Sequence, residues 1–184
     1  MNNYYILNFK GNFIKDNIDI LNNFSSSWGY YKENIDKIIT EEGLDYIRKL
    51  NVNPFNVKAN IYVGHPNESS HIHSDTPPSS KISYAINYVW GDSDLTSKMF
   101  WYKQLNNGTD STTFINTKYL VYQQNDVELI EEIEVPNNTL FLVRINVPHM
   151  VTNYSNNKRF CFSIRGEPYL AWNNVQTYFK NFIL

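Results

Sequence analysis

The segment Asn56-Val57-Lys58-Ala59-Asn60-Ile61-Tyr62-Val63 decides the fold, because apolar residues occupy every second position. A period of two residues is that of a β-strand with one buried face. From residue 56 onward, similar short segments are separated by Asn, Gly, Pro and Ser at intervals of about ten residues. This spacing is typical of an all-β sandwich or barrel.

The remaining strand predictions follow from the same pattern. They cover residues 70–75, 81–89, 97–104, 119–124, 128–135, 139–145, 147–153 and 159–165. Eight antiparallel strands in two sheets form a double-stranded β-helix, the jelly roll of cupin-like proteins. The pattern leaves open whether residues 119–124 belong to the core sheets. We therefore predict a mainly β, cupin-like jelly roll with flanking helices.

The two ends of the chain carry weaker signals. Residues 2–9 predict a short strand and residues 16–24 a short helix, whereas Thr40 with the acidic residues after it predicts a capped helix over 40–51. Pro168 opens a predicted C-terminal helix over 168–179. We expect one domain over residues 1–184, with a jelly-roll core at about 56–166, an N-terminal flank at 1–55 and a C-terminal helix within 167–184.

Composition narrows the class of protein. The chain has 184 residues, 42% hydrophobic content and a formal net charge of -2. This length suits one domain with a real core, and the charge balance gives no strong nucleic-acid signal. A single cysteine excludes an internal disulfide, and the N-terminus lacks signal-peptide features, so we expect a cytoplasmic protein. No apolar run approaches the roughly 20 residues of a membrane span.

The motif His71-Ile72-His73-Ser74-Asp75 is the main candidate for chemistry. On an extended segment, His73 and Asp75 project to the same side. An imidazole and a carboxylate supply two ligands of the facial triad of two histidines and one carboxylate, which suits Fe(II) and leaves coordination positions open. His149, in Val147-Pro148-His149, is the candidate third ligand.

The strand predicted over 159–165 places two cations near these ligands. Its alternation puts Arg159, Cys161, Ser163 and Arg165 on one face, with Phe160, Phe162 and Ile164 on the other. If the polar face points inward, a guanidinium lies in the same interior as His149. A buried guanidinium requires an anionic partner, and a carboxylate matches its geometry.

The order of His73, Asp75, His149 and an arginine about ten residues later resembles the Fe(II)- and 2-oxoglutarate-dependent dioxygenases. The match covers about residues 56–166. The resemblance implies that His73, Asp75 and His149 bind Fe(II), and that Arg159 anchors the distal carboxylate of the cosubstrate 2-oxoglutarate. Arg165 is the second candidate for that anchor, and Tyr84 is the candidate for assisting the cosubstrate. The implied reaction hydroxylates a small-molecule or peptide substrate, with release of succinate and CO2.

Several alternatives remain open at this stage. His71 alternates onto the same side as His73, so a His71, His73 and His149 site of a cupin-like metalloenzyme without 2-oxoglutarate is one of them. A non-catalytic jelly-roll binding or structural protein is another. His65 is more consistent with a loop position than with a ligand, and Cys161 with a small buried residue than with a nucleophile. The substrate and the oligomeric state are not encoded in any motif.

Overall fold

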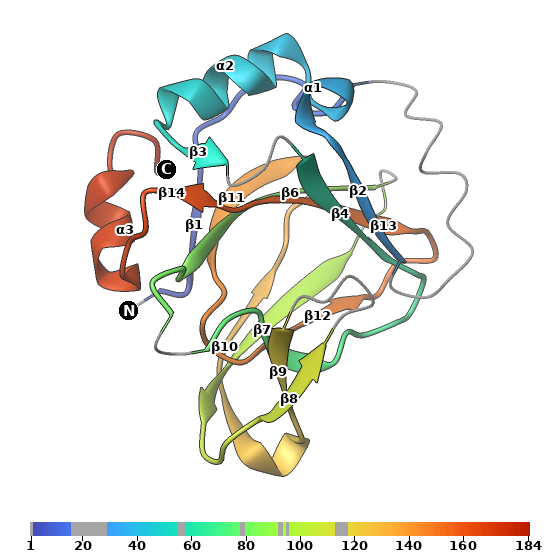
Figure 1. The fold of residues 1–184 in the computed structure, drawn as a ribbon. Helices are drawn as coiled ribbons and strands as arrows, with labels where there is room; N and C mark the ends of the chain where they lie inside the picture. The colour runs from blue at the N-terminus through green and yellow to red at the C-terminus, as the bar shows by residue number, and fades with distance from the viewer. Residues whose placement is uncertain are drawn as a thin grey trace.

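Two antiparallel β-sheets face each other in the computed structural model (Figure 1). The structure describes residues 2–15, 29–54, 58–77, 80–91, 94, 96–112 and 118–184. Within these ranges each of the two sheets has six strands, and a third, small sheet has two. The protein is therefore mainly β, as predicted.

The first sheet has the strand order β1-β11-β6-β13-β4-β2, and the second has the order β10-β7-β12-β5-β9-β8. The strands of the first sheet are β1 (Tyr4–Ile6), β2 (Gly29–Asn34), β4 (Lys58–Gly64), β6 (Tyr84–Gly91), β11 (Thr139–Arg144) and β13 (Arg159–Ile164). Those of the second are β5 (Ile72–Ser74), β7 (Ser97–Gln104), β8 (Thr109–Thr112), β9 (Lys118–Tyr122), β10 (Val127–Glu134) and β12 (His149–Asn153). The small sheet pairs β3 (Asn53–Pro54) with β14 (Gly166–Glu167).

This strand order is that of a jelly roll. Numbered from 1 to 8 in chain order, the strands β4, β5, β6, β7, β10, β11, β12 and β13 lie as 6-3-8-1 in the first sheet and 5-4-7-2 in the second. The chain thus changes sheets at every step except between the fourth and fifth strands. The β8–β9 hairpin is inserted at that step and extends the second sheet beyond β5, so the segment predicted at 119–124 lies outside the eight-strand core.

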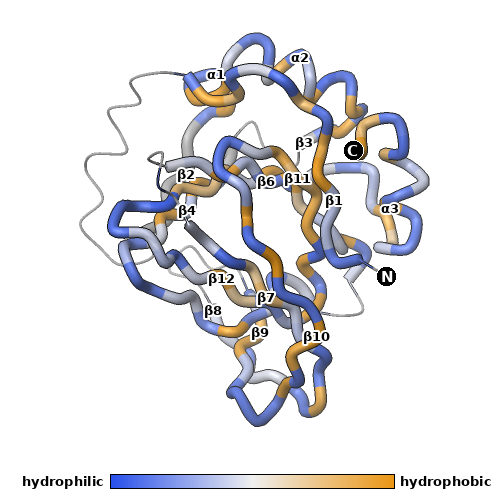
Figure 2. The backbone as a smooth tube through the Cα atoms, turned by 180° about the vertical axis from the view of Figure 1, so that it is seen from behind, coloured by the Kyte–Doolittle hydropathy of each residue, from blue (hydrophilic) through white to orange (hydrophobic). Residues whose placement is uncertain are grey.

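The space between the sheets is filled mainly by apolar side chains from alternate positions. Trp101 of β7 is fully buried there and stacks on Tyr4 of β1, with ring centroids 5.8 Å apart. On β13, Cys161 points into this core, whereas Phe162 and Ile164 point to the other side of the sheet. The predicted division of this strand into two faces is confirmed. In Figure 2, β10 alternates between hydrophobic and hydrophilic stretches, and its apolar residues Leu129 and Ile130 are exposed.

The three α-helices of the described chain cover the outer face of the first sheet (Figure 1). They are α1 (Ile35–Ile38), α2 (Glu41–Lys49) and α3 (Trp172–Tyr178), and a single 3-10 turn, η2, spans Gln124–Asp126. Thr40 caps α2 by accepting a hydrogen bond from the Gly43 N–H at 3.1 Å, as the sequence predicted. None of the described helices is long and apolar enough to cross a membrane.

The sequence predicted the eight jelly-roll strands within a few residues of their ends, but it missed β2, β8, helix α1 and the two strands of the small sheet. It also predicted the C-terminal helix too long, since α3 begins at Trp172. The helix predicted over 16–24 lies outside the described residues. Because β1 and β2 form the two edges of the first sheet, part of the expected N-terminal flank belongs to the jelly-roll sheet itself.

We predict that Phe13→Ala lowers the free energy of unfolding by about 3–5 kcal/mol. Phe13 is fully buried and contacts Tyr88 of β6 and Phe162 of β13, with ring centroids 4.9 and 5.8 Å away. Its removal leaves a cavity between the N-terminal segment and the first sheet. Denaturant unfolding measures the loss, and Leu105→Ala, at a side chain 53% exposed, serves as the control that changes stability by under about 0.5 kcal/mol. An equal effect of both substitutions would contradict this packing.

Candidate metal centre

Two histidines face each other across neighbouring strands of the second sheet. His149, the first residue of β12, is the register partner of His73 in β5. Opposed residues of an antiparallel pair project to the same face, and the two ring centroids are 4.5 Å apart. His149 also pairs with Trp101 on its other side, so this face is the inner one.

Asp75 completes a three-residue cluster. It follows β5, and its N–H donates a hydrogen bond at 3.0 Å to the carbonyl oxygen of Ile145, which follows β11 in the first sheet. Its Oδ1 lies 3.5 Å from His73 Nε2. One ligand atom each from His73, Asp75 and His149 lie within 4.8 Å of one another. The structure therefore brings together the three predicted ligands.

Backbone contacts orient both imidazole rings. The Nδ1 atom of His73 is 2.8 Å from the His71 carbonyl oxygen, and that of His149 is 2.9 Å from the Val147 carbonyl oxygen. A carbonyl oxygen can only accept, so each Nδ1 carries a hydrogen, and the Nε2 of each ring has its lone pair when that ring is neutral. This is the tautomer in which Nε2 can bind a metal.

The pKa values of the cluster reflect burial and charge together. Burial, reinforced by the positive charge of His73, lowers the pKa of His149 to about 4, so His149 is neutral at pH 7. For His73, burial acts to lower the pKa, but the hydrogen bond and charge of Asp75 outweigh it and raise the pKa. For Asp75, burial acts to raise the pKa, but Arg165 and the histidines outweigh it and hold the pKa far below its ordinary value. Asp75 is thus a carboxylate at every physiological pH.

The donor set fits a divalent transition metal. Two imidazole nitrogens and one carboxylate oxygen form the donor set that suits Fe(II) and leaves positions for further ligands. The side chains of His73 and Asp75 are 22% and 20% exposed, so the site is reachable from solvent. The chemistry available to such a centre is binding and activation of small ligands at the open positions.

Arg165 contacts the second oxygen of Asp75. Its Nη2 donates a hydrogen bond at 2.7 Å to Asp75 Oδ2, and both side chains are largely buried. Because Oδ1 faces His73 and Oδ2 faces Arg165, the carboxylate has one oxygen directed toward the histidines. The guanidinium therefore positions the acidic ligand, and the sequence did not identify Asp75 as the partner of Arg165.

Arg159 lies at the opposite end of β13 from Arg165. It is 3% exposed, and its Nε donates to Ser97 Oγ at 3.3 Å. The Cys161 thiol also interacts with Arg159, and burial lowers the Arg159 pKa. No carboxylate pairs with Arg159 among the residues that the structure describes. Arg159 and Arg165 thus share the predicted inner face but occupy different places in it.

The structure does not support a cosubstrate role for Tyr84. Along β6, Tyr84, Ile86 and Tyr88 face the helices, where Tyr84 packs against Phe179 and its hydroxyl donates to the Pro168 carbonyl oxygen at 3.2 Å. The H-x-H alternative also fails within the described chain, because His71 is exposed and stands outside the cluster. His65 is likewise outside it. Sequence reasoning missed Tyr119 of β9, whose ring meets His73 edge-on at 6.2 Å.

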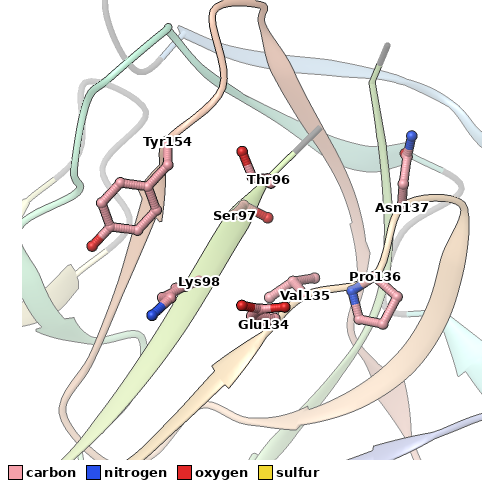
Figure 3. Close-up of a pocket in the computed structure, with 8 residues that line it drawn as sticks. All are labelled: Thr96, Ser97, Lys98, Glu134, Val135, Pro136, Asn137 and Tyr154. Atoms are coloured by element: carbon pink, nitrogen blue, oxygen red, sulfur yellow. The ribbon is translucent and has the colours of Figure 1, made fainter. Parts of the chain in front are cut away.

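A separate pocket of about 500 Å³ lies around the start of β7 (Figure 3). Residues 96–98 and 134–137 line it together with Tyr154, and none of the three cluster residues does. Ser97 is four residues from Trp101, the register partner of His149, which is about 13 Å along a strand. The pocket therefore belongs to the Arg159 end of the barrel rather than to the metal end.

Comparisons with known proteins add little to this geometry. No family model matches the sequence, and no curated protein matches it either. Solved structures with a similar chain path include Peruvianin-I, a cysteine peptidase from Thevetia peruviana latex, at 11% identity and a TM-score of 0.39, over 92% of each chain. An oxalate oxidase in complex with the substrate analogue glycolate has 9% identity and a TM-score of 0.42, over 92% of this chain and 76% of that one. The ycfD protein of E. coli has 9% identity and a TM-score of 0.40, over 90% of this chain and 42% of that one. Likenesses this distant carry no functional information.

We predict that Mn2+ or Co2+ raises the melting temperature of the protein and that His149→Ala abolishes this effect. A ligand that binds only the folded state stabilises it by about 2.7 kcal/mol at a hundredfold excess over its Kd. Differential scanning fluorimetry measures the shift. His71→Ala is the matched control and keeps the full shift, because His71 is exposed and lies outside the cluster. Loss of the shift in His71→Ala would restore the H-x-H alternative.

We predict that Arg165→Met lowers the free energy of unfolding of the metal-free protein by about 3 kcal/mol at pH 7, because Asp75 is left buried without its cation. The folded-state pKa of Asp75 lies below its ordinary value of 3.8. The stabilisation from this pair is therefore complete above about pH 4 and is lost as the pH falls through the folded-state pKa. The difference between wild type and variant should shrink below pH 4.

The matched control for this comparison is Arg48→Met, which removes the exposed pair of Arg48 with Asp45. Since exposed pairs contribute under about 1 kcal/mol, this variant should be near wild type at both pH values. Urea unfolding at pH 7 and at pH 3.5 provides the measurement. A difference for Arg165→Met that does not depend on pH would contradict the pairing with Asp75.

Proposed function

We propose that this chain is an Fe(II)- and 2-oxoglutarate-dependent dioxygenase that hydroxylates a small-molecule or peptide substrate. The observation that carries the proposal is the buried Arg159 guanidinium, which has no carboxylate partner in the described chain and shares the barrel interior with His73, Asp75 and His149. An enclosed guanidinium of this kind favours a ligand that brings its own carboxylate.

The proposed roles of the metal cluster and of Arg159 follow from their positions near opposite ends of β13. The cluster of His73, Asp75 and His149 holds the metal at one end, and Arg159 lies six residues before Arg165 at the other. In this proposal, a linear dicarboxylate places its 2-oxo acid group at the metal and its distal carboxylate at Arg159. This dicarboxylate is the cosubstrate, and it must lie between the two sheets.

Iron, when bound, supplies the activation of O2 coupled to oxidative decarboxylation of 2-oxoglutarate. The balanced reaction converts substrate, O2 and 2-oxoglutarate to hydroxylated substrate, succinate and CO2. The protein orients the residues that would hold the iron. Arg165 bonds to the second oxygen of Asp75, and backbone carbonyl oxygens bond to both imidazole rings. The apolar core around Trp101 and Val143 forms the rest of the interior between the two sheets.

We predict that anaerobic addition of 2-oxoglutarate to the Fe(II) protein produces the visible charge-transfer band of a chelated 2-oxo acid. Titration of this band gives the affinity for 2-oxoglutarate, and Arg159→Met should weaken it by about tenfold to a hundredfold, since a charge-assisted hydrogen bond contributes about 1.5–3 kcal/mol. Arg144→Met is the matched control. Arg144 is half-buried on β11 but bonds to Asn3 and Asn146, so its loss should leave the affinity within about threefold of wild type.

Other outcomes separate the competing functions. A protein that binds iron but gives no band would favour a cupin-like metalloenzyme that does not use 2-oxoglutarate. A protein that binds neither would favour a non-catalytic jelly-roll module. Release of succinate and CO2 in an aerobic assay measures the proposed reaction, and His149→Ala should abolish both.

A further inference from the structure

Three polar side chains form a row across the inner face of the first sheet. Asn87 of β6 is the register partner of Ser163 of β13, and Ser163 is in turn the partner of Asn60 of β4. We call Asn60, Asn87 and Ser163 the polar row. Along β13, Ser163 is two residues from Arg165 and four from Arg159 on the same face. The polar row therefore crosses the barrel between the metal end and the Arg159 end.

Asn87 is the member of this row with an unsatisfied hydrogen-bonding atom. Its Oδ1 is buried and accepts no hydrogen bond. Its neighbours on the same face of β6, Ala85 and Val89, are buried in the apolar core. A buried amide oxygen without a partner is unfavourable for folding, and buried polar groups are normally paired. The Asn87 amide thus weakens the folded protein unless something else binds to it.

A second inward-facing asparagine shows how this fold satisfies such a group. Asn153 of β12 is fully buried, and its Nδ2 donates to the carbonyl oxygens of Gly64, His65 and Asn157. Its Oδ1 accepts from the Ser155 backbone and hydroxyl. Asn153 therefore has a structural role. The Asn87 side chain, by contrast, remains partly accessible on the inner face.

We propose that Asn87 is a positioning residue that donates its amide N–H to the 2-oxo acid end of the bound cosubstrate. This inference rests on the proposed function. The amide oxygen and nitrogen exchange places by rotation of the side chain, so the ligand decides which of them faces it. A 2-oxo acid presents only acceptors, and it selects the nitrogen.

The position of the polar row identifies which part of the cosubstrate Asn87 contacts. Arg159 takes the distal carboxylate, and the middle of 2-oxoglutarate consists of methylene groups that offer no hydrogen bond. The oxygen atoms that remain are those of the 2-oxo acid group. Ser163 is two residues before Arg165, which contacts Asp75, and Asn87 is the register partner of Ser163. The 2-oxo acid group is therefore the part of the cosubstrate that lies beside Ser163 and Asn87.

The first test is on stability without ligand. Asn87→Leu removes the unpaired buried oxygen, so its melting temperature in chelator should rise by about 2–6 °C. Asn153→Leu is the matched control at an inward-facing asparagine that is fully bonded, and its melting temperature should fall. A fall for Asn87→Leu would show that the Asn87 amide supports the fold, and it would overturn the inference.

The second test is on ligand binding, by calorimetric titration of 2-oxoglutarate into the Mn2+-loaded protein. Asn87→Leu should raise the Kd at least tenfold, and Asn87→Asp at least a hundredfold, because a carboxylate then faces the carboxylate of the ligand. Mn2+ binding itself should stay within threefold in Asn87→Leu. The combination of a more stable protein and a weaker ligand is not produced by a merely structural residue.

The outcomes distinguish this inference from the proposed function. If wild type binds 2-oxoglutarate and both Asn87 variants bind it equally well, the role of Asn87 is wrong and the proposed function stands. If wild type binds Mn2+ but not 2-oxoglutarate, the proposed function is wrong and the inference fails with it.

Discussion

The site depends on the pairing of β12 with β5, which places His149 opposite His73. These residues are far apart in the chain, and only the jelly-roll order makes their strands neighbours. The backbone of Asp75 then bonds to Ile145 beside the first sheet, and Arg165 reaches Asp75 from the end of β13. The cluster therefore joins both sheets at one end of the barrel, and any change in strand register would separate its members.

The inner face of the barrel combines an apolar core with a few costly polar groups. Trp101, Val143 and their neighbours fill most of it, whereas Arg159 and the amide of Asn87 lie among them with little compensation from the protein. Burying such groups lowers the stability of the fold. A fold therefore retains them most readily where a ligand supplies their missing hydrogen bonds or charge partner. Asn153 shows that the same interior can fully bond an amide when its role is structural.

Alternation along single strands explains how far prediction from the sequence reached. It correctly divided β13 into an inner face with Cys161 and an outer face with Phe162 and Ile164. The same rule would have placed Tyr84 outside, because Tyr84 shares its face with Ile86 and Tyr88, but the resemblance to a family outweighed it. His71 was expected beside His73, yet β5 begins only at Ile72, so alternation does not extend to it. Strands β2 and β8 were missed because their pairing with β4 and β9, rather than their own hydrophobic pattern, makes them strands.

The sequence by itself determined the class of fold, the eight core strands, and the three residue types that meet as possible metal ligands, because these follow from local periodicity and from the spacing of one motif. Only the tertiary structure decided that Arg165 pairs with Asp75, that Arg159 is buried without an acidic partner in the described chain, and that Asn87 lacks a hydrogen bond at its oxygen. Such facts depend on which side chains of distant strands come within 3 to 4 Å of one another. Strand order and register set those distances, and neither is a local property of the chain.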